Sequence, residues 1–484
     1  MNLRPCVRIV FLVVLSSPAL AADFSPGFTA VDASPTFVPR PAIETARRQG
    51  NLLLQSVLAE NGASFPGTTF TVMRGEPDAY GKTRYTVMAI SGPQAHAVFQ
   101  LSPGPYLIRA QNGAVAREET VDVPPSGLLR HQMVLDAGEL QLNSWMSGDR
   151  EPAEETWFQV FHSDTDAYGK PSRVQIAGNG YAAQARFVLP AGSYQVEATY
   201  GNASLTLPLS ITAGTSSQHD LLLDAGRLEI SSSLAEDGEP LPGTLISIYP
   251  HGTAKVDDQD RQRPVAEAES PGRLAFILPA GDYLVKARLD LAEVSIPVSV
   301  AAGEMLSREI PLQAGELKLS ASLTGHDEPL HNSWFEIHRG KGEPDWRSRR
   351  GPSHKARYIL PAGRYQVSVK VGKGLGRLTV DIEPGDELSE SIEVDGGRIN
   401  LRLVEADGER LHPHAQFSVY QVEKDGLGDI QRRRVFNEGF YADTDLILPS
   451  GEYLAFARDN TYRGELRFRL EAGETKDLTI VSAR

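Results

Sequence analysis

The sequence predicts an all-β protein of five tandem antiparallel Greek-key β-sandwich modules that form an elongated rod. Two observations lead to this prediction. Short motifs return about every 88 residues, and between them apolar residues alternate with polar ones. Alternation with a period of two residues is typical of a strand that buries one face. About seven such strands in each module, separated by turn residues, is the pattern of a β-sandwich.

A motif of proline, glycine and tyrosine marks each module. Proline fixes φ, glycine permits a tight corner, and a tyrosine can bury its ring while its hydroxyl bonds a nearby backbone group. We therefore expect these tyrosines to be buried and structural. They are spaced 88, 89, 82 and 88 residues apart, at Tyr106, Tyr194, Tyr283, Tyr365 and Tyr453.

A second marker, glycine followed two residues later by leucine or isoleucine, opens each module and sets its boundaries. The predicted segments are a signal peptide (1–21), a Pro-rich flexible leader (22–49), and modules 1 to 5 (50–137, 138–225, 226–314, 315–396 and 397–484). Junctions of two or three residues leave little room for free swinging. By the usual scaling of radius with chain length, five modules end to end span roughly 150 to 200 Å.

The corner motif resembles the tyrosine corner of immunoglobulin-like and fibronectin type III sandwiches. As a whole, the module resembles the transthyretin-like (prealbumin-like, or carboxypeptidase-regulatory-like) repeats of bacterial envelope proteins, some of which accompany a von Willebrand A domain. The metal-binding D-x-S-x-S run of that domain does not occur in the sequence. The resemblance implies a fold and an envelope location, but such sandwiches host many roles, so no functional residue is carried over.

The N-terminal residues predict export. Arg4 and Arg8 flank a short apolar run that leads to Ala19-Leu20-Ala21, the pattern of a secretory signal peptide. The only cysteine, Cys6, precedes the apolar run, so we expect neither a lipid-bearing cysteine nor disulfides in the exported chain. No later segment has the run of about 18 apolar residues that a membrane span needs. The net charge of -14 argues against nucleic acid and anionic lipid as partners.

The pentapeptide Asp78–Lys82 recurs without change at Asp166–Lys170. Both copies occupy the same place in their modules, so repetition of the module explains them. Asp164–Gly169 has the opening of a calcium loop, but Gln175 stands where the loop needs glutamate. A hairpin loop that uses aspartate and glycine for its turn is the simpler interpretation.

Further candidates lie in the equivalent hairpin loops of the other modules, which we call the loop column, or on nearby strands. Arginines cluster at 347–350 and at 432–434, where they could contact an anion or an acidic glycan, or form solvated hairpins and intermodule ion pairs. An aromatic residue at a hairpin tip could contact a glycan or a protein, or cover a junction between modules. The candidate interaction residues are Asp78, Tyr80, Asp166, Tyr168, Trp346, Arg349 and Arg433.

Histidines and prolines complete the set of notable residues. The histidines of modules 4 and 5 fit no compact zinc motif, so we favour scattered surface residues over a metal site. They are His326, His331, His338, His354, His412 and His414.

Pro208 and Pro297 occupy equivalent positions of modules 2 and 3, inside strands whose other residues alternate well. Because proline cannot donate to a ladder, these strands should lie at sheet edges.

The sequence holds no catalytic motif in its required context, and similar modules argue against a single active site. We therefore expect no catalytic residue, cofactor or metal. The predicted function is a non-catalytic exported spacer or protein-interaction scaffold, periplasmic or secreted, with envelope proteins as partners. The alternative is an extracytoplasmic protein that binds glycan or metal through the hairpin loops.

Overall fold

The computed structural model describes residues 50–165, 171–251, 263–339, 347–406, 408, 410–424, 430–441, 443–459 and 463–482. These residues form 35 β-strands and no helix, as the alternation predicts. Within them, no helical segment has the length and apolarity needed to cross a membrane. The predicted signal peptide and leader lie outside the described residues.

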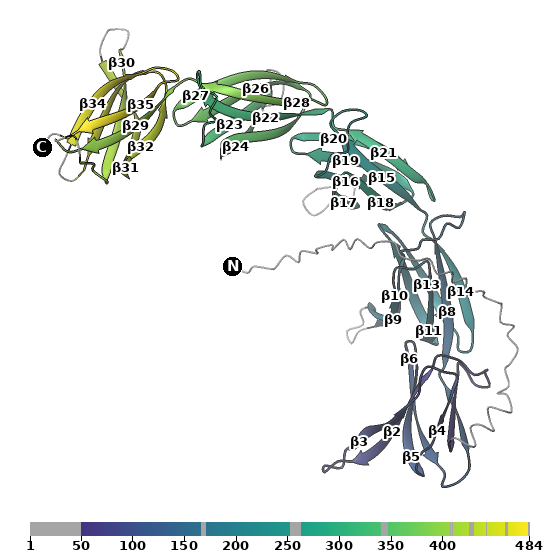
Figure 1. Ribbon diagram of the computed structural model, residues 1–484. Coiled ribbons are helices and arrows are strands. Elements are labelled where there is room, and N and C mark those ends of the chain that lie inside the picture. The colour runs from purple at the N-terminus through teal and green to yellow at the C-terminus, as the bar shows by residue number, and fades with distance from the viewer. Residues whose placement is uncertain are drawn as a thin grey trace, which may run out of the picture. The chain divides into compact units, whose positions relative to one another are not determined.

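The chain divides into two compact units that meet between Ala137 and Gly138. One pair of sheets lies in the first unit, and four pairs follow in the second. The strands of each pair lie within the range of one predicted module, except that β8, β15 and β22 begin one residue before the predicted starts. The names module 1 to module 5 are kept, and the module bounds remain a prediction. The all-β fold class with five tandem sandwich modules is confirmed (Figure 1). The rod remains a prediction.

In modules 1 and 2, a three-stranded sheet and a four-stranded sheet make up each sandwich. Module 1 has the orders β4-β1-β7 and β3-β2-β5-β6, with β1 (Leu52–Val57), β2 (Thr69–Pro77), β3 (Thr83–Ile90), β4 (His96–Phe99), β5 (Gly104–Asn112), β6 (Val115–Val123) and β7 (Leu129–Val134). Module 2 has the orders β11-β8-β14 and β10-β9-β12-β13, with β8 (Ala137–Trp145), β9 (Trp157–Thr165), β10 (Pro171–Asn179), β11 (Gln184–Pro190), β12 (Gly192–Tyr200), β13 (Ala203–Ile211) and β14 (Ser216–Leu222).

Modules 3 to 5 repeat this arrangement. Module 3 has the orders β18-β15-β21 and β17-β16-β19-β20, with β15 (Ala225–Ser233), β16 (Thr244–Pro250), β17 (Ala266–Ser270), β18 (Arg273–Pro279), β19 (Gly281–Leu289), β20 (Ala292–Val300) and β21 (Met305–Pro311). Module 4 has the orders β25-β22-β28 and β24-β23-β26-β27, with β22 (Ala314–Leu323), β23 (Ser333–Arg339), β24 (Arg347–Ser353), β25 (Lys355–Pro361), β26 (Gly363–Val371), β27 (Gly374–Ile382) and β28 (Glu387–Val394). Module 5 has the orders β32-β29-β35 and β31-β30-β33-β34, with β29 (Gly397–Val404), β30 (Ala415–Lys424), β31 (Ile430–Tyr441), β32 (Asp443–Leu448), β33 (Gly451–Arg458), β34 (Arg463–Leu470) and β35 (Thr475–Val481).

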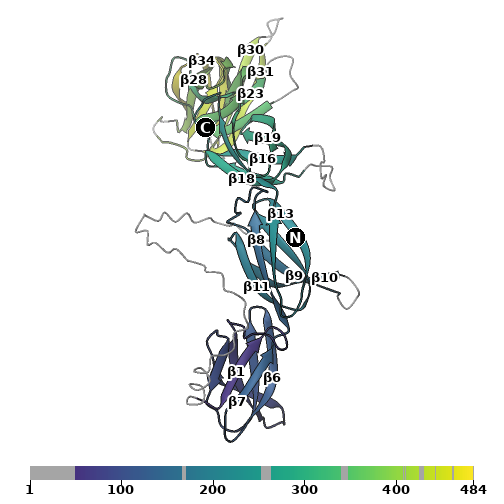
Figure 2. The same cartoon turned by 90° about the vertical axis from the view of Figure 1, so that its right-hand side faces the viewer.

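One ladder in each module departs from the antiparallel prediction. The first and seventh strands pair in parallel, as β1 and β7 do in Figure 2. In modules 1, 3, 4 and 5, the ladder between the first strand and the fourth is antiparallel, as it is for β1 with β4. The order also differs from that of a constant-type immunoglobulin domain, in which the first strand shares a sheet with the second, fourth and fifth.

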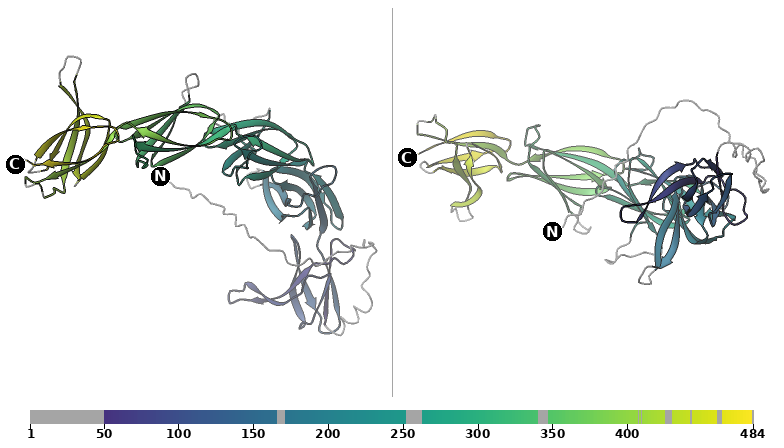
Figure 3. Two further views of the ribbon diagram at one scale, coloured as in Figure 1. Left: turned by 45° about the horizontal axis from the view of Figure 1, so that its top comes forward. Right: turned by 90° about the horizontal axis from the view of Figure 1, so that it is seen from below.

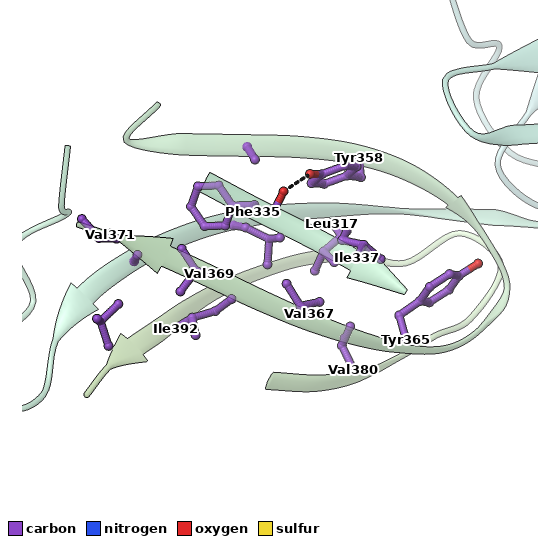
Figure 4. Packing of buried hydrophobic residues seen from close by; sticks show 14 of the residues in the cluster. Leu317, Phe335, Ile337, Tyr358, Tyr365, Val367, Val369, Val371, Val380 and Ile392 are labelled. Atoms are coloured by element: carbon purple, nitrogen blue, oxygen red, sulfur yellow. Dashed lines mark hydrogen bonds between the residues drawn. The ribbon is translucent and has the colours of Figure 1, made fainter. Parts of the chain in front are cut away.

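The alternating apolar residues meet between the two sheets of each sandwich and form its core. In module 4, Phe335 and Ile337 from the larger sheet face Leu317 and Tyr358 from the smaller sheet, and all four are at most 1% exposed (Figure 4). The Tyr358 hydroxyl donates to the carbonyl of Phe335 at 3.3 Å. Burial therefore leaves this polar atom with a partner, as a close-packed core requires.

The two prolines at equivalent positions lie on β13 and β20, each the last strand in the order of its four-stranded sheet. Pro208 is opposite Gln195, and Pro297 is opposite Leu284. The predicted edge position is confirmed. A proline there removes a donor from the open edge and so hinders pairing with another chain.

A buried carboxylate stabilises the smaller sheet of module 4. Glu316 on β22 is 7% exposed and accepts two hydrogen bonds from Arg357 on β25, at 2.6 and 3.2 Å. Lys318 lies 3.1 Å from the same carboxylate. The hydrogen bonds from Arg357 lower the pKa of the Glu316 carboxyl below its ordinary value of 4.5. Module 2 has the equivalent pair, Arg186 and Glu139.

This pair predicts an acid-sensitive contribution to the stability of module 4. Because the folded-state pKa of Glu316 is depressed, its contribution is complete above the ordinary value of 4.5 and is lost as pH falls through the folded value. Glu316→Gln should therefore weaken module 4 at neutral pH and flatten its loss of stability in acid. Denaturant unfolding at a series of pH values, with wild type beside the variant, measures this difference. Equal pH slopes for the two chains would contradict it.

Candidate functional site

The first pentapeptide forms the loop of the β2–β3 hairpin. One carboxylate oxygen of Asp78 accepts the backbone N–H groups of Tyr80 and Lys82, both at 2.9 Å. The Asp78 N–H donates to the carbonyl of Lys82 at 2.9 Å, and Gly81 adopts a φ of +77°. A left-handed conformation suits glycine and strains most other residues. Asp78 and Gly81 thus serve the turn, which is the simpler of the two interpretations.

The Tyr80 side chain, unlike the backbone N–H of this residue, makes no contact in the turn that the structure records. Its residue is 96% exposed at the tip of the hairpin. Its side chain is therefore accessible to a partner. The second pentapeptide and Trp346 cannot be compared with it, because Asp166, Tyr168 and Trp346 lie outside the described residues.

The hairpin gives a prediction that separates its two prominent side chains. Asp78→Ala removes the acceptor of two backbone N–H groups and should destabilise the turn by about 1 kcal/mol, whereas Tyr80→Ala should change stability by less than about 0.5 kcal/mol. Hydrogen exchange at the Lys82 amide should accelerate in the first variant alone. Faster exchange in Tyr80→Ala would mean that the tyrosine also supports the turn.

Arg349 and Arg350 contact residues of the protein. The Arg349 guanidinium lies over the Trp334 ring at 4.2 Å, on the neighbouring strand of the same sheet. Arg350 pairs with Asp290 of module 3 and lies 4.4 Å from the centre of the Tyr358 ring. The pair of Arg350 with Asp290 is an ion pair between modules. It is one of the interpretations that the sequence left open for these arginines.

Arg433 lies on β31 opposite Gln421 of β30. Its guanidinium donates to the Gln421 side-chain oxygen at 2.8 Å. Such a cross-strand pair is typical of a solvated sheet face. Arg349 and Arg433 belong to modules 4 and 5 of the second unit, whereas Asp78 and Tyr80 belong to the first unit.

The described histidines and carboxylates do not gather into a metal site. Among the residues that the structure describes, no group of three or more metal-ligating side chains of His, Cys, Asp or Glu is close enough to share an ion. The rings of His331 and His354 lie 5.9 Å apart, His326 bonds the carbonyl of Gly473, and His338 lies 3.5 Å from Glu336. The calcium alternative at Asp164–Gly169 falls largely outside the described residues.

The five corner tyrosines share one geometry. Each ring is at most 6% exposed, and each hydroxyl donates to the carbonyl four residues earlier in the chain, at 2.7 to 3.0 Å. Burial raises the pKa of Tyr453 to about 12, so its hydroxyl stays protonated and remains a donor. The acceptors are Ser102, Pro190, Pro279, Pro361 and Pro449.

Three isoleucines next to the corner motif lie at the junctions between modules of the second unit. In module 4, Ile359 is 2% exposed and belongs to the apolar core of module 3, and Ile447 of module 5 belongs likewise to the core of module 4. Ile277 of module 3 packs against the core of module 2. The role of these residues could not be predicted from the sequence, because an isoleucine in an alternating pattern is expected to pack in the core of its own module.

The backbone closes these junctions in the same way each time. The turn between the fifth and sixth strands donates an N–H to the carbonyl of the isoleucine in the next module: Asn202 to Ile277, Leu291 to Ile359, and Lys373 to Ile447, at 2.9, 3.3 and 3.0 Å. A glycine in the turn between the sixth and seventh strands donates to the backbone at the start of its own module: Gly303 to Ala225, the first residue of β15, Gly385 to Ala314, the first residue of β22, and Gly473 to Gly396, which directly precedes β29. The second unit is thus joined by repeated specific contacts.

Comparison with known proteins assigns no family. No family model and no curated protein matches the chain. Among solved structures, the TIE protein of Bacillus anthracis is 15% identical, with 70% of this chain and 72% of that chain covered and a TM-score of 0.17. A streptococcal ancillary pilin is 13% identical, with 53% and 98% covered and a TM-score of 0.22. The major pilin subunit BcpA of Bacillus cereus is 11% identical, with 53% and 99% covered and a TM-score of 0.15. Likenesses this low carry no inference about this chain.

Proposed function

We propose that this chain is an exported, non-catalytic scaffold of the bacterial cell envelope, which holds protein partners at fixed spacing along tandem β-sandwich modules. The observation that carries the proposal is the repeated junction. At three successive junctions of the second unit, a packed isoleucine and a backbone hydrogen bond to its carbonyl join one module to the next. Linkers that only tether domains need no such contacts, whereas a spacer depends on them.

The exposed hairpin tip supports the interaction part of this role. Tyr80 presents a large aromatic side chain to solvent, and aromatic residues are enriched where proteins bind one another. Three of the arginines that could have favoured an acidic glycan, Arg349, Arg350 and Arg433, contact Trp334, Asp290 and Gln421 of the protein. Protein partners are therefore favoured over glycan or metal.

Capture from envelope extracts tests the proposal. The exported chain serves as bait beside a variant with Tyr80→Ala, Tyr168→Ala and Trp346→Ala, in which Asp78 is left in place because it supports the turn. We expect defined envelope proteins to bind the wild-type chain and to be depleted with the variant. Stoichiometric binding of a glycan or a metal ion, without protein partners, would overturn the proposal.

A further inference from the structure

The hairpin of module 1 concentrates exposed apolar side chains. Five of the sixteen large apolar residues that are exposed among the described residues lie between positions 80 and 90. Every residue of β3 except Ala89 is exposed. A cluster of this kind marks an interaction surface more often than scattered single residues do. Its members are Tyr80, Tyr85, Val87, Met88 and Ile90, with exposed fractions of 96, 51, 51, 51 and 63%.

The strand that carries this cluster has an unpaired edge. β3 is the outermost strand of its sheet, and β2 pairs with β5 only as far as Met73. Beyond that point, Arg74–Pro77 pair with β3 alone. The hairpin therefore extends past the sandwich as a two-stranded ribbon, which Figures 1 and 3 show as the purple arm of the first unit. A ribbon of two strands is marginally stable by itself and gains from a further strand.

The equivalent edges of the other modules carry proline or several charges, whereas β3 has a single bulge, at Met88. Proteins guard open edges with proline and charge. β10 begins with Pro171, β17 contains Glu267 and Glu269, β24 contains Pro352 and three arginines, and β31 contains the arginines at 432–434. By contrast, the sequence of β3 is Thr-Arg-Tyr-Thr-Val-Met-Ala-Ile, with one charge, no proline and five strong β-formers among its eight residues.

We propose that β3 pairs with β3 of a second copy of this chain, antiparallel about a two-fold axis at Thr86, and so joins two four-stranded sheets into one. In that register Tyr85 is opposite Val87 of the second copy, and Thr86 is opposite its own counterpart. Aromatic with β-branched residues, and threonine with threonine, are favourable cross-strand pairs. Arg84, the only charged residue of the strand, is opposite Met88, so no like charges meet. An isologous contact of this kind closes at two copies.

The proposal rests on the scaffold function and extends it, because a chain that pairs through its first module links two arrays of modules into one assembly. The strand that pairs with the open edge of β3 comes from a second copy of this chain rather than from an unrelated protein, because the sequence of β3 is complementary to itself in this register. A surface for an unrelated peptide would need no such symmetry.

Charged substitutions of Thr86, the residue at the proposed two-fold axis, test the register in which the two β3 strands pair. Thr86 is exposed, so Thr86→Lys and Thr86→Glu should fold normally. Each variant places like charges opposite one another, and the dimer dissociation constant should rise about tenfold or more. An equimolar mixture of the two variants should restore the dimer. Sedimentation velocity and light scattering of the purified exported chain measure the masses. Val174→Lys, on the exposed edge strand β10, is the matched control and should leave the dimer intact.

A cysteine at position 86 tests the proposed pairing independently, by disulfide crosslinking. Because the chain's only cysteine is Cys6, Thr86→Cys introduces a single reporter into the exported chain. It should form an intermolecular disulfide under mild oxidation, and Val174→Cys should not. Wild-type chain that stays monomeric, or a dimer that Thr86→Lys leaves unchanged, would overturn the proposal. A monomer that still captures envelope proteins would overturn this pairing and leave the scaffold function standing.

Discussion

Tyr283→Ala is expected to destabilise module 3 by about 3 to 5 kcal/mol, the usual cost of losing a large buried aromatic side chain. The residue is 6% exposed and belongs to the core of module 3. Removing its ring leaves a cavity and leaves the carbonyl of Pro279 without its 2.7 Å donor. Hydrogen exchange at the core amides of β16 and β19, measured in the full chain, reports the local free energy of opening.

Tyr283→Phe separates the ring from the hydroxyl. This variant keeps the packing and loses one hydrogen bond, so it should cost about 0.5 to 1.5 kcal/mol. If Tyr283→Phe were as harmful as Tyr283→Ala, the hydroxyl contact would dominate and the ring would be of minor importance. If neither changed the exchange of module 3, Tyr283 would not be structural.

The features that sequence reasoning predicts well are those that repeat with a fixed period. The alternation in Phe335-Glu336-Ile337 places two residues in the core and one outside it, and the structure buries both apolar residues. Pro208 predicts an edge because a missing N–H excludes a central strand, and β13 is at the edge. Local chemistry decides both cases, so no knowledge of distant contacts is needed.

Strand neighbours could not be predicted in the same way. Alternation assigns a residue to a face of its strand, but it does not say which strand lies beside it. The parallel pairing of β1 with β7, more than 70 residues away in the chain, follows from the packing of the whole module. The exposure of β3 is a second example. Tyr85 and Val87 alternate like half-buried residues, yet Tyr85 lies in the two-stranded ribbon beyond β5 and Val87 lies where β2 makes its last pair with β5, and both are 51% exposed.

Contacts between modules were also hidden. From the sequence, Asp290 is expected to be an ordinary turn residue, and its φ of +55° fits that role. Its carboxylate nevertheless accepts the N–H of Ile359 at 2.9 Å and pairs with Arg350, both in module 4. A repeat shows that equivalent residues exist in each module, but it does not show which of them serve the neighbouring module.

Ile359→Ala is expected to destabilise modules 3 and 4 together. Ile359 belongs to a strand of module 4, but its side chain is 2% exposed and lies in the core cluster of module 3. In return, Leu291 of module 3 packs against the core cluster of module 4. Truncation of a buried isoleucine to alanine costs about 2 to 5 kcal/mol. Because this side chain connects two cores, part of the loss should appear as weaker coupling between them.

Hydrogen exchange of the full chain, followed separately in β19 of module 3 and β26 of module 4, measures how the loss is shared. The matched control is Ile337→Ala, which removes the same atoms from a residue whose contacts lie within the core of module 4. That control should accelerate exchange in module 4 and leave module 3 unchanged, whereas Ile359→Ala should accelerate exchange in both. If the two variants gave the same pattern, with module 3 unaffected, the junction would not couple the cores. The fixed spacing proposed for the scaffold would then lose its structural basis in these isoleucines.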